Sequence, residues 1–294
     1  MRLFIAALAC VFSVSLLCQN EYSLIFDGID DWVYVPDDNS FDLSGQDFTI
    51  ELYYKTPGST NTSTVAIITD YINNASSYFY IKLNPDNQVQ FALNEGGSSS
   101  CSVISGSQIG DNQWHHIAIT RSIQNNSLSF FLDGNLVDTM SCFYTGNISS
   151  GQGLAIGGNH QARFTACSIS KISLSSIVRY EEDFTPPCEF ILDENLMIYY
   201  DFLEGEGNQL NDLSGNGNSV GNLATINGAS WSTDYPSCAN EGCTDSSACN
   251  YDATATIDDG SCEYITPVDL GEDIETCDES VTLDAGEGYD SYLW

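Results

Sequence analysis

The chain has 294 residues, of which 42% are hydrophobic and 16% are charged. Its 41 acidic and 7 basic residues give a formal net charge of -34. This length and hydrophobic content allow one large domain with its own core and smaller additional units. Nucleic acid and anionic membrane surfaces are unfavourable partners, because both attract clustered Lys and Arg side chains. The excess of carboxylates favours divalent cations as counterions, or else a solvated acidic surface.

The amino-terminal segment Met1–Cys18 has the pattern of a signal peptide, with Arg2 followed by an apolar run from Leu3 to Leu17. The run is too short for a convincing transmembrane span. Cleavage after Cys18 would leave Gln19 first, and lipidation of Cys18 is disfavoured because Leu17 is not a small residue. We therefore predict a secreted or cell-surface, extracellular protein without membrane insertion.

Cysteine usage agrees with export, because exported chains with many cysteines form disulfides. Two of the 11 cysteines lie in the predicted signal peptide, which leaves Cys101, Cys142, Cys167, Cys188, Cys238, Cys243, Cys249, Cys262 and Cys277. Because this number is odd and Cys277 lies near the end of the sequence, we expect its partner to be missing and the third unit to be truncated.

Short runs of alternating apolar and polar residues, separated by Gly, Asn, Asp and Ser, follow from Tyr22 to Arg179. Alternation at period two is typical of strands with one buried face. The expected strands are Ser23–Phe26, Trp32–Val35, Phe48–Tyr54, Val65–Thr69, Tyr78–Leu83, Val89–Leu93, Trp114–Thr120, Leu128–Leu132 and Ile169–Ile177. Asp133-Gly134-Asn135 predicts a hairpin turn. Helical periodicity is nearly absent, so the fold class is all-β, a sandwich or barrel.

The region after Arg179 predicts two more strands at Leu196–Phe202 and Ala224–Trp231, joined by a Gly- and Asn-rich loop. We expect four parts: a signal peptide (1–18), a β domain (19–237), a Cys- and Asp-rich segment (238–264) and the start of a further module (265–294). In the last part, Val281–Leu283 and Tyr289–Trp294 have strand character.

Three motifs resemble laminin-G-like jelly-roll domains of the concanavalin A-like superfamily. They are SLIFDGIDDWVYVPD (Ser23–Asp37), QWHHIAITRS (Gln113–Ser122) and SLSFFLDGNLVDT (Ser127–Thr139). The resemblance implies a two-sheet antiparallel jelly-roll sandwich. The segment Tyr199–Asn218 precedes the FDG strand in such domains but follows the last core strand here. We therefore expect a circularly permuted domain in which these late strands complete the two sheets.

Two further segments resemble parts of secreted surface proteins of gliding bacteria. Gly242–Tyr264, with its GCTD, ACNY and DDGSC motifs, is similar to a cysteine-rich repeat of those proteins. Val268–Trp294 is similar to the first half of an immunoglobulin-like module.

Two acidic loops of the β domain are candidate calcium sites. In FDGIDD, Asp27 and Asp30, with the adjacent Asp31, offer the oxygen ligands that calcium prefers. The alternative is turn chemistry, because Asp-Gly commonly forms turns. In the later loop, Asp212 and Asn216 offer a second calcium site, or else Asx turns alone.

The Cys- and Asp-rich segment is a third candidate calcium site, because it is too polar to form a core of its own. The proposed ligands are Asp245, Asn250, Asp252, Asp258 and Asp259. Their spacing is not that of an EF-hand. The alternative is a small knot held by Cys238, Cys243, Cys249 and Cys262 alone, for which three connectivities are possible. Zinc is not expected, because exported cysteines oxidise.

The remaining cysteines are expected to stabilise the sandwich. Cys101 and Cys142 flank the QWHHIAITR strand and the Asp-Gly hairpin, and are expected to link neighbouring strands. Cys167 and Cys188 are expected to link the last core strand to the turn at Pro186–Pro187.

No pattern of catalytic residues is present. His115 and His116 are adjacent and face opposite sides of a strand. Retaining glycosidases of this sandwich need two carboxyl groups about 5 Å apart, and neither Glu181–Asp183 nor Glu272–Glu275 has that spacing. Tyr71, Tyr78, Tyr80, Phe143, Tyr144 and Phe164 are candidate ligand contacts, although such rings more often serve packing.

We predict a non-catalytic recognition or adhesion module that binds carbohydrate or an extracellular protein and is stabilised by calcium. The alternatives are a structural spacer in a large adhesin and an accessory domain of a polysaccharide hydrolase. The sequence carries no information on oligomeric state or on the identity of the ligand.

Overall fold

The computed structural model describes residues 22–37, 43, 45–58, 64–70, 77–95, 99–144, 146, 148, 151, 153–158, 163–214, 224–236, 241–252, 255 and 257–264. The chain divides into two compact units, residues 1–237 and residues 238–294. The predicted signal peptide, Asn216, Cys238, Cys277 and the predicted immunoglobulin-like module lie outside the described residues.

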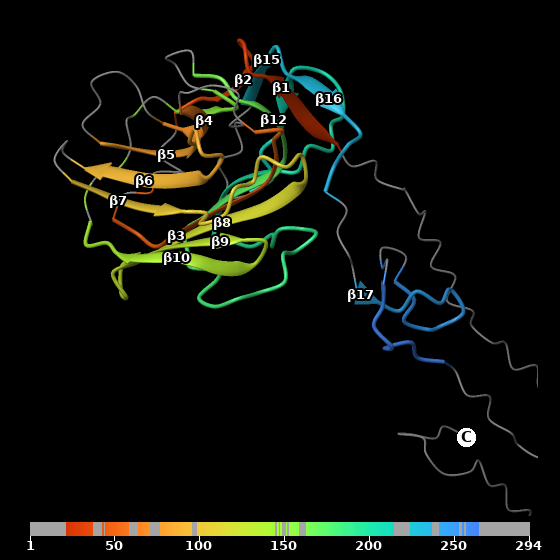
Figure 1. Cartoon of the computed structure of the whole chain (residues 1–294). Helices are drawn as coiled ribbons and strands as arrows, with labels where there is room; N and C mark the ends of the chain where they lie inside the picture. The colour runs from red at the N-terminus through yellow and green to blue at the C-terminus, as the bar shows by residue number, and fades with distance from the viewer. Residues whose placement is uncertain are drawn as a thin grey trace, which may run out of the picture. The chain divides into compact units, whose positions relative to one another are not determined.

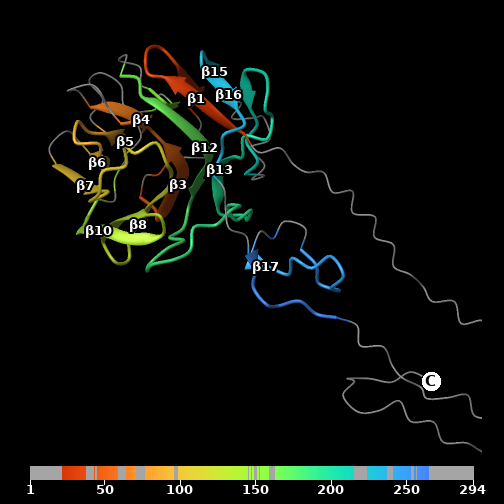
Figure 2. The same ribbon diagram turned by 45° about the vertical axis from the view of Figure 1, so that its right-hand side comes forward.

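The first unit is a sandwich of two eight-stranded antiparallel sheets, which confirms the predicted fold class. Sheet A runs in the order β10-β9-β8-β3-β12-β1-β16, with β13 also paired to β12. Its strands are β1 (Ser23–Asp27), β3 (Phe48–Lys55), β8 (Trp114–Ser122), β9 (Ser127–Leu132), β10 (Asn135–Ser141), β12 (Ala166–Ser175), β13 (Leu196–Tyr200) and β16 (Ser230–Ser232). Figure 2 shows β1 and β12 side by side, as their register requires.

Sheet B runs in the order β14-β15-β2-β11-β4-β5-β6-β7. Its strands are β2 (Trp32–Val35), β4 (Val65–Thr69), β5 (Tyr78–Leu83), β6 (Val89–Glu95), β7 (Ser99–Ile104), β11 (Leu154–Ile156), β14 (Gln209–Leu210) and β15 (Ala224–Asn227). Figure 1 shows the two layers, with β5, β6 and β7 stacked against β8, β9 and β10.

The core lies between the sheets and follows from the alternation of the strands. In β5, for example, Phe79, Ile81 and Leu83 are buried, whereas Tyr78, Tyr80 and Lys82 point outward and are half-buried. Alternate side chains of a strand project to opposite faces, so the sequence of β5 places three apolar side chains in the core. The same alternation places Val33 and Val35 of β2 in the core.

The middle of the outer face of sheet A is covered by the segment Ser176–Asn195, which we call the strap. Tyr53 of β3 donates a hydrogen bond to the carbonyl of Pro187, and Lys171 of β12 donates one to that of Cys188. The rings of Tyr180 and Phe184 stack with centroids 3.6 Å apart. The strap explains why β3 and β8 are buried on both faces.

The Cys101–Cys142 disulfide joins the edges of the two sheets. Cys101 lies on β7, the edge strand of sheet B, and Cys142 follows β10, the edge strand of sheet A. At the same edge, Asp138 of β10 accepts a hydrogen bond from the backbone N–H of Ile104 at 2.9 Å. Exposed strand edges can pair with other chains. Here the disulfide and the hydrogen bond to Asp138 join the two edge strands to each other.

The predicted disulfide between Cys167 and Cys188 is wrong. Cys167 is a buried free thiol in the core of the sandwich, and burial raises its pKa. Cys188 lies instead in the strap, where its carbonyl accepts the hydrogen bond from Lys171. The two cysteines are therefore on opposite faces of sheet A, and no disulfide can span a sheet.

The late strands complete both sheets, as expected. β13 pairs with β12 in sheet A, and β15 pairs with β2 in sheet B. The single strand predicted over Ala224–Trp231 is two strands, because the chain leaves sheet B after β15 and joins sheet A as β16. Gly228, with φ of 84°, makes the crossing between them. Strands β7 and β11 were not predicted, and neither was β14, which lies within the predicted Gly- and Asn-rich loop.

In the part of the second unit that the structure describes, β17 (Glu241–Gly242) and β18 (Ile257–Asp258) form a short parallel pair. The Cys243–Cys262 disulfide closes this unit. Cys249 is a free, exposed thiol, and so does not form the disulfide predicted for it among the described residues. Its backbone N–H donates to the carbonyl of Glu263 at 2.7 Å.

The described part of the chain contains no helix that is long and apolar enough to cross a membrane.

Candidate functional site

The outer face of sheet B carries half-buried aromatic residues on two strands. Trp32 and Tyr34 point outward from β2, with ring centroids 5.7 Å apart. Tyr78 and Tyr80 point outward from β5, with stacked rings whose centroids are 6.2 Å apart. We call these four rings, with Lys82, the aromatic face.

Small and polar side chains separate the two pairs of rings. The strand register forms one row across sheet B: Thr225, Tyr34, Ala155, Thr69, Tyr80, Ala92 and Ser102. Side chains stand roughly perpendicular to a sheet, so this row projects from the outer face, where Ala155 and Thr69 between the two tyrosines are buried. Three inter-strand spacings separate these two tyrosines, which is about 14 Å.

Lys82 contacts the second ring pair. Its ammonium group lies 4.2 Å from the centroid of the Tyr80 ring and donates a hydrogen bond to the Tyr80 hydroxyl at 3.1 Å. Burial lowers the pKa of Lys82, and the charge of Arg163 lowers it further. Burial also raises the pKa of Tyr80. The site thus combines flat rings with a cation, next to the amide side chains of Gln90 and Asn94 on β6.

The turn between β1 and β2 brings together Asp27, Asp30 and Asp31. The calcium-site interpretation of the FDGIDD motif requires such a group of carboxylates. Carboxylate oxygens of the three residues all lie within 4.8 Å of one another. Asp27 and Asp30 are exposed, whereas Asp31 is 7% exposed. Asp27 Oδ1 accepts the N–H of Ile29, and Asp31 Oδ2 accepts the N–H of Asp27 at 2.8 Å.

Burial raises the pKa of Asp31, and the negative charges of Asp27 and Asp30 add to this effect. A proton or a cation would relieve the repulsion among the three groups. Three carboxylate oxygens suit a hard divalent cation such as calcium, which takes 6–8 oxygen ligands and completes its shell with carbonyls or water. The residues present therefore fit the cation that the sequence predicts here.

The carboxylate of Asp212 accepts hydrogen bonds from neighbouring protein groups. Its Oδ1 accepts the N–H groups of Tyr199 and Ser214 at 2.9 and 3.0 Å, and its Oδ2 accepts the Ser214 hydroxyl. This is the Asx-turn alternative for the loop. Its predicted co-ligand Asn216 lies outside the described residues.

In the second unit, several predicted calcium ligands hold the backbone. Asn250 Nδ2 donates to the carbonyl of Ser261, and Asn250 Oδ1 accepts the N–H of Glu263. Asp245 accepts hydrogen bonds from Ser247 and from the Tyr264 hydroxyl. Asp258 and Asp259 each accept a hydrogen bond from the backbone N–H two residues later in the chain.

The acidic residues of this unit do not gather as those of the β1–β2 turn do. Among the residues that the structure describes, Asp27, Asp30 and Asp31 are the one group arranged to hold a metal. Asp252, the remaining predicted ligand, lies beside Gly242, where its side chain is 3.3 Å from the position of a Cβ. The calcium site in the second unit stays a prediction.

His115 and His116 do not share a site, as predicted. His115 lies between Asp133 and Asp111, with ring nitrogens 2.8 and 3.2 Å from their carboxylates. His116 is buried beneath the strap, where its Nε2 lies 3.4 Å from Glu51 Oε2. Glu51 is itself buried and accepts hydrogen bonds from Ser173 and Tyr180. This carboxylate is covered, and a polysaccharide has no access to it.

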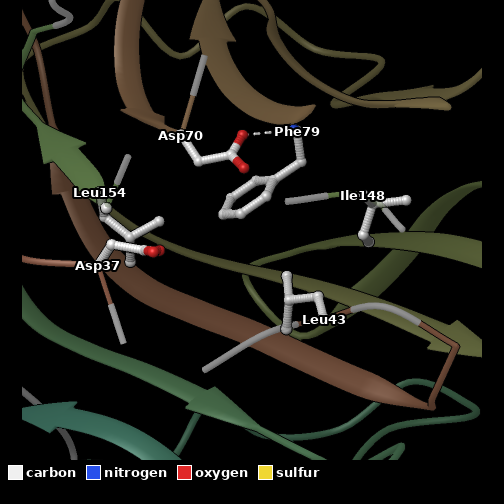
Figure 3. Close-up of a pocket in the computed structure, with 7 residues that line it drawn as sticks. Asp37, Leu43, Asp70, Phe79, Ile148 and Leu154 are labelled. Carbon is white, nitrogen blue, oxygen red and sulfur yellow. Dashed lines mark hydrogen bonds between the residues drawn. The ribbon is translucent and has the colours of Figure 1, made fainter. Parts of the chain in front are cut away.

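A small hollow opens where β2 and β4 end and β11 begins (Figure 3). It has a volume of about 10 Å³ and is lined by Asp37, Leu43, Asp70, Phe79, Ile148, Gly153 and Leu154. Asp70 Oδ1 accepts the backbone N–H of Phe79 at 2.7 Å, the contact drawn as a dashed line. A hollow of this size has room for about one water molecule, far below the 300 Å³ or more of typical ligand pockets. Asp70 there fixes the start of β5.

The predicted contact aromatics separate into different environments. Tyr78 and Tyr80 belong to the aromatic face, and Phe143 is 73% exposed. Tyr144 packs against the core and Phe164 against Gly158, while Tyr71 lies outside the described residues. Trp32, Tyr34 and Lys82 were not among the candidates named from the sequence, although the alternation of β2 and β5 places them on the outer face.

Sequence comparison identifies the family. A laminin G-type profile described as the concanavalin A-like lectin/glucanases superfamily matches residues 27–183, more than half of the chain. The chain belongs to this superfamily. The match begins at the acidic β1–β2 turn and ends in the strap, so it covers most strands of both sheets of the superfamily sandwich. No sequence among the curated proteins matches the chain.

The solved structures that are similar to this chain are distant from it in sequence. A Bacteroides ovatus protein described as carbohydrate binding has a TM-score of 0.55 and 16% identity, over 72% of this chain and 59% of that one. A SAP-like pentraxin from Limulus polyphemus has a TM-score of 0.42 and 14% identity, over 55% and 79%. Domains LG4-5 of the mouse laminin alpha1 chain have a TM-score of 0.42 and 15% identity, over 53% and 42%. The chain spans 59% of the length of the first protein, and this similarity shows the superfamily fold alone.

Proposed function

We propose that this chain is a non-catalytic recognition module of a secreted or cell-surface protein, and that it binds carbohydrate through the aromatic face of sheet B. The observation that carries the proposal is the difference between the two outer faces. The strap covers β3 and β8 in the middle of sheet A, whereas Tyr34, Tyr78 and Tyr80 stay half-buried on sheet B. Flat rings pack against the apolar faces of sugar rings, and their polar edges accept nearby hydroxyl groups.

A binding role without catalysis agrees with the side chains on this face. The outward positions of β2, β4, β5 and β6, all within the described residues, carry aromatic, small, amide and lysine side chains. Glycoside hydrolysis needs a pair of carboxyl groups flanking the bond to be cleaved. The buried Glu51 beneath the strap is on the opposite face of the sandwich.

We also propose that calcium binds at the β1–β2 turn and stabilises the module. Asp27 and Asp30 would supply exposed ligands and Asp31 a buried one. Asp27 lies at the end of β1 in sheet A and Asp31 directly before β2 in sheet B, so the ion would stabilise the link between the two sheets. The Cys101–Cys142 disulfide supports a location outside the cell, where such bonds persist.

A panel of immobilised oligosaccharides, probed with the full chain, tests the proposed function. We expect binding that Tyr80→Ala and Tyr34→Ala each weaken by about tenfold, since stacking contacts are worth about 1 kcal/mol or more. Leu192→Ala is the matched control, because Leu192 is an exposed apolar side chain on the strap over sheet A. Absence of binding to any oligosaccharide, or equal losses in the control, would overturn the proposal.

A further inference from the structure

The strands of the first unit begin and end at neighbouring points of sheet A. β1 begins at Ser23, and β16 ends at Ser232, which is directly opposite Ser23 in the register of the two strands. The two strands are antiparallel and lie side by side (Figure 2). A pull on the chain before β1 and after β16 would therefore act across one end of this pair and open its hydrogen bonds one after another.

The pairing of β16 alone gives little resistance to such a pull. β16 has three residues and lies at the edge of sheet A, where it pairs with β1. Segments with few buried contacts and few backbone hydrogen bonds open locally at a low cost in free energy. Without further contacts, β16 would leave the sheet before the longer strands.

The segment Thr233–Pro236, which follows β16 and which we call the exit segment, has such contacts at Asp234. Its Oδ2 lies 2.7 Å from Nζ of Lys55 on β3, and its Oδ1 accepts the indole N–H of Trp114 on β8 at 3.2 Å. The carbonyl of Asp234 accepts the hydroxyl of Ser23 on β1 at 2.7 Å. One residue of the exit segment is thus bonded to β1, β3 and β8.

These contacts lie on the outer face of sheet A. Leu24 and Tyr54 belong to the core, so their neighbours Ser23 and Lys55 project to the opposite face. Ser23 is 0% exposed although it points away from the core, which agrees with its bond to the exit segment. In the sheet, β1 and β12 lie between β16 and β3. Asp234 therefore connects the edge of sheet A to strands in its middle.

The charges at this contact favour a local role over a general one. The hydrogen bond from Lys55 lowers the pKa of Asp234, and the bond from Trp114 adds to this effect, so the carboxylate is ionised at neutral pH. The side chain of Asp234 is 52% exposed. Ion pairs this exposed contribute little to the stability of a whole domain. The position of Asp234 next to the edge strand gives the contact its importance.

We propose that Asp234 and its three partners form a clasp that holds β16 in place when the chain on either side of the first unit is under tension. A pull from beyond the exit segment reaches Asp234 before it reaches β16, so the load passes to β3 and β8. Tension of this kind acts on any module that links a surface to a bound partner. The clasp goes beyond the proposed function and does not depend on which ligand is bound.

The test compares unfolding under tension with unfolding in urea. The full chain is held by its two ends at constant force, and the rate of unfolding of the first unit is measured. Asp234→Ala should unfold about fivefold faster, the factor that corresponds to about 1 kcal/mol for a well-placed exposed ion pair. In urea, unfolding does not have to begin at β16, so the same variant should unfold about twofold faster or less. Asp86→Ala, at an exposed carboxylate between β5 and β6, is the matched control and should change neither rate.

Two further measurements assign the effect to the clasp. Lys55→Met leaves Asp234 bonded to Trp114 and should produce part of the acceleration under tension. Adding Lys55→Met to Asp234→Ala should cause little further change, because the two residues form one contact. Hydrogen exchange without force gives an independent measure: the amides of β16 should exchange faster in Asp234→Ala, whereas those of β9 should not.

The outcomes that would overturn the clasp are distinct from those that test carbohydrate binding. Equal unfolding rates of the parent chain and Asp234→Ala under tension would contradict it. An acceleration in urea as large as that under tension would show that Asp234 stabilises the whole domain, and faster exchange in β9 would lead to the same conclusion. Each result leaves the oligosaccharide panel as the test of the proposed function.

Discussion

Asp31 Oδ1 lies so close to the backbone of Gly228 that a Cβ atom at position 228 would overlap this oxygen. Asp31 lies between β1 and β2, and Gly228 lies between β15 and β16, so both residues are on links that cross from one sheet to the other. The missing side chain at position 228 thus leaves room for the buried carboxylate of the proposed calcium site.

We predict that Gly228→Ala destabilises the sandwich more than Gly207→Ala does. Both glycines have φ of 84°, but nothing lies within 4 Å of a Cβ built at Gly207. The positive φ alone should cost each variant about 1–2 kcal/mol. The overlap with Asp31 should add to the loss at position 228. Urea unfolding measures both free energies, and equal losses would contradict the close approach.

Asp31→Asn should have opposite effects with and without calcium. In EDTA at neutral pH, the variant should be more stable than the parent chain, because it removes one of three clustered negative charges. Calcium should stabilise the parent chain by about 2.7 kcal/mol at 100 times its Kd, and the variant much less. Asp86→Asn, at an exposed turn carboxylate, is the control. A calcium effect that survives in Asp31→Asn would contradict the site.

The pH dependence of stability follows from the raised pKa of Asp31. The folded state holds a proton on Asp31 more tightly than the unfolded state, so it binds more protons between pH 3.8 and the folded pKa. Without calcium, the contribution of Asp31 to the free energy of unfolding must fall as the pH rises through this window. Unfolding measured in EDTA should show a smaller fall in Asp31→Asn. An unchanged slope would be inconsistent with a raised pKa.

Local patterns predicted most of the fold. The alternation of residues in β5 and β2 predicted both the strands and which side chains face the core. The carboxylates of the FDGIDD motif lie together because they are close in sequence. Strand β7 was missed because Ser99–Ser102 is rich in serine, and β11 because it has three residues. The break at Gly228 was missed because Ala224–Trp231 reads as one continuous strand.

Features that depend on packing between distant segments could not be predicted. The positions of Cys167 on the last core strand and of Cys188 after the Pro186–Pro187 turn suggested a disulfide, but the two residues lie on opposite faces of the sheet. The hydrogen bond between Ala66 of β4 and the carbonyl of Arg163 forms because the chain before β12 runs beside β4. No local pattern encodes such a contact, and the aromatic face became recognisable only from the register across sheet B.

His115 should titrate above its usual range in the folded protein. The hydrogen bond to Asp133 raises its pKa, and Asp111 adds to this effect. Its contribution to stability is therefore present below pH 6.5 and is lost as the pH rises through the folded pKa. Asp133→Asn keeps an acceptor for the His116 N–H and suits the positive φ of 49°. An NMR titration should show a lower His115 pKa in this variant. An unchanged value would contradict the pairing.

The Cys101–Cys142 disulfide should contribute about 4 kcal/mol, as the chain-entropy model gives for a loop of its length. The double variant Cys101→Ser/Cys142→Ser should lose this amount in urea unfolding followed by tryptophan fluorescence. Reductant should lower the stability of the parent chain to a similar degree and cause little further loss in the double variant. A variant within 1 kcal/mol of the parent chain would show that the edge is held by other contacts.

The most direct test of carbohydrate binding through sheet B is a map of backbone amide shifts during titration with the tightest-binding oligosaccharide of the panel. The account predicts that the largest shifts lie on β2, β4, β5 and β6, around Tyr34, Tyr80 and Lys82. Shifts confined to the strap over sheet A, or to the second unit, would contradict it.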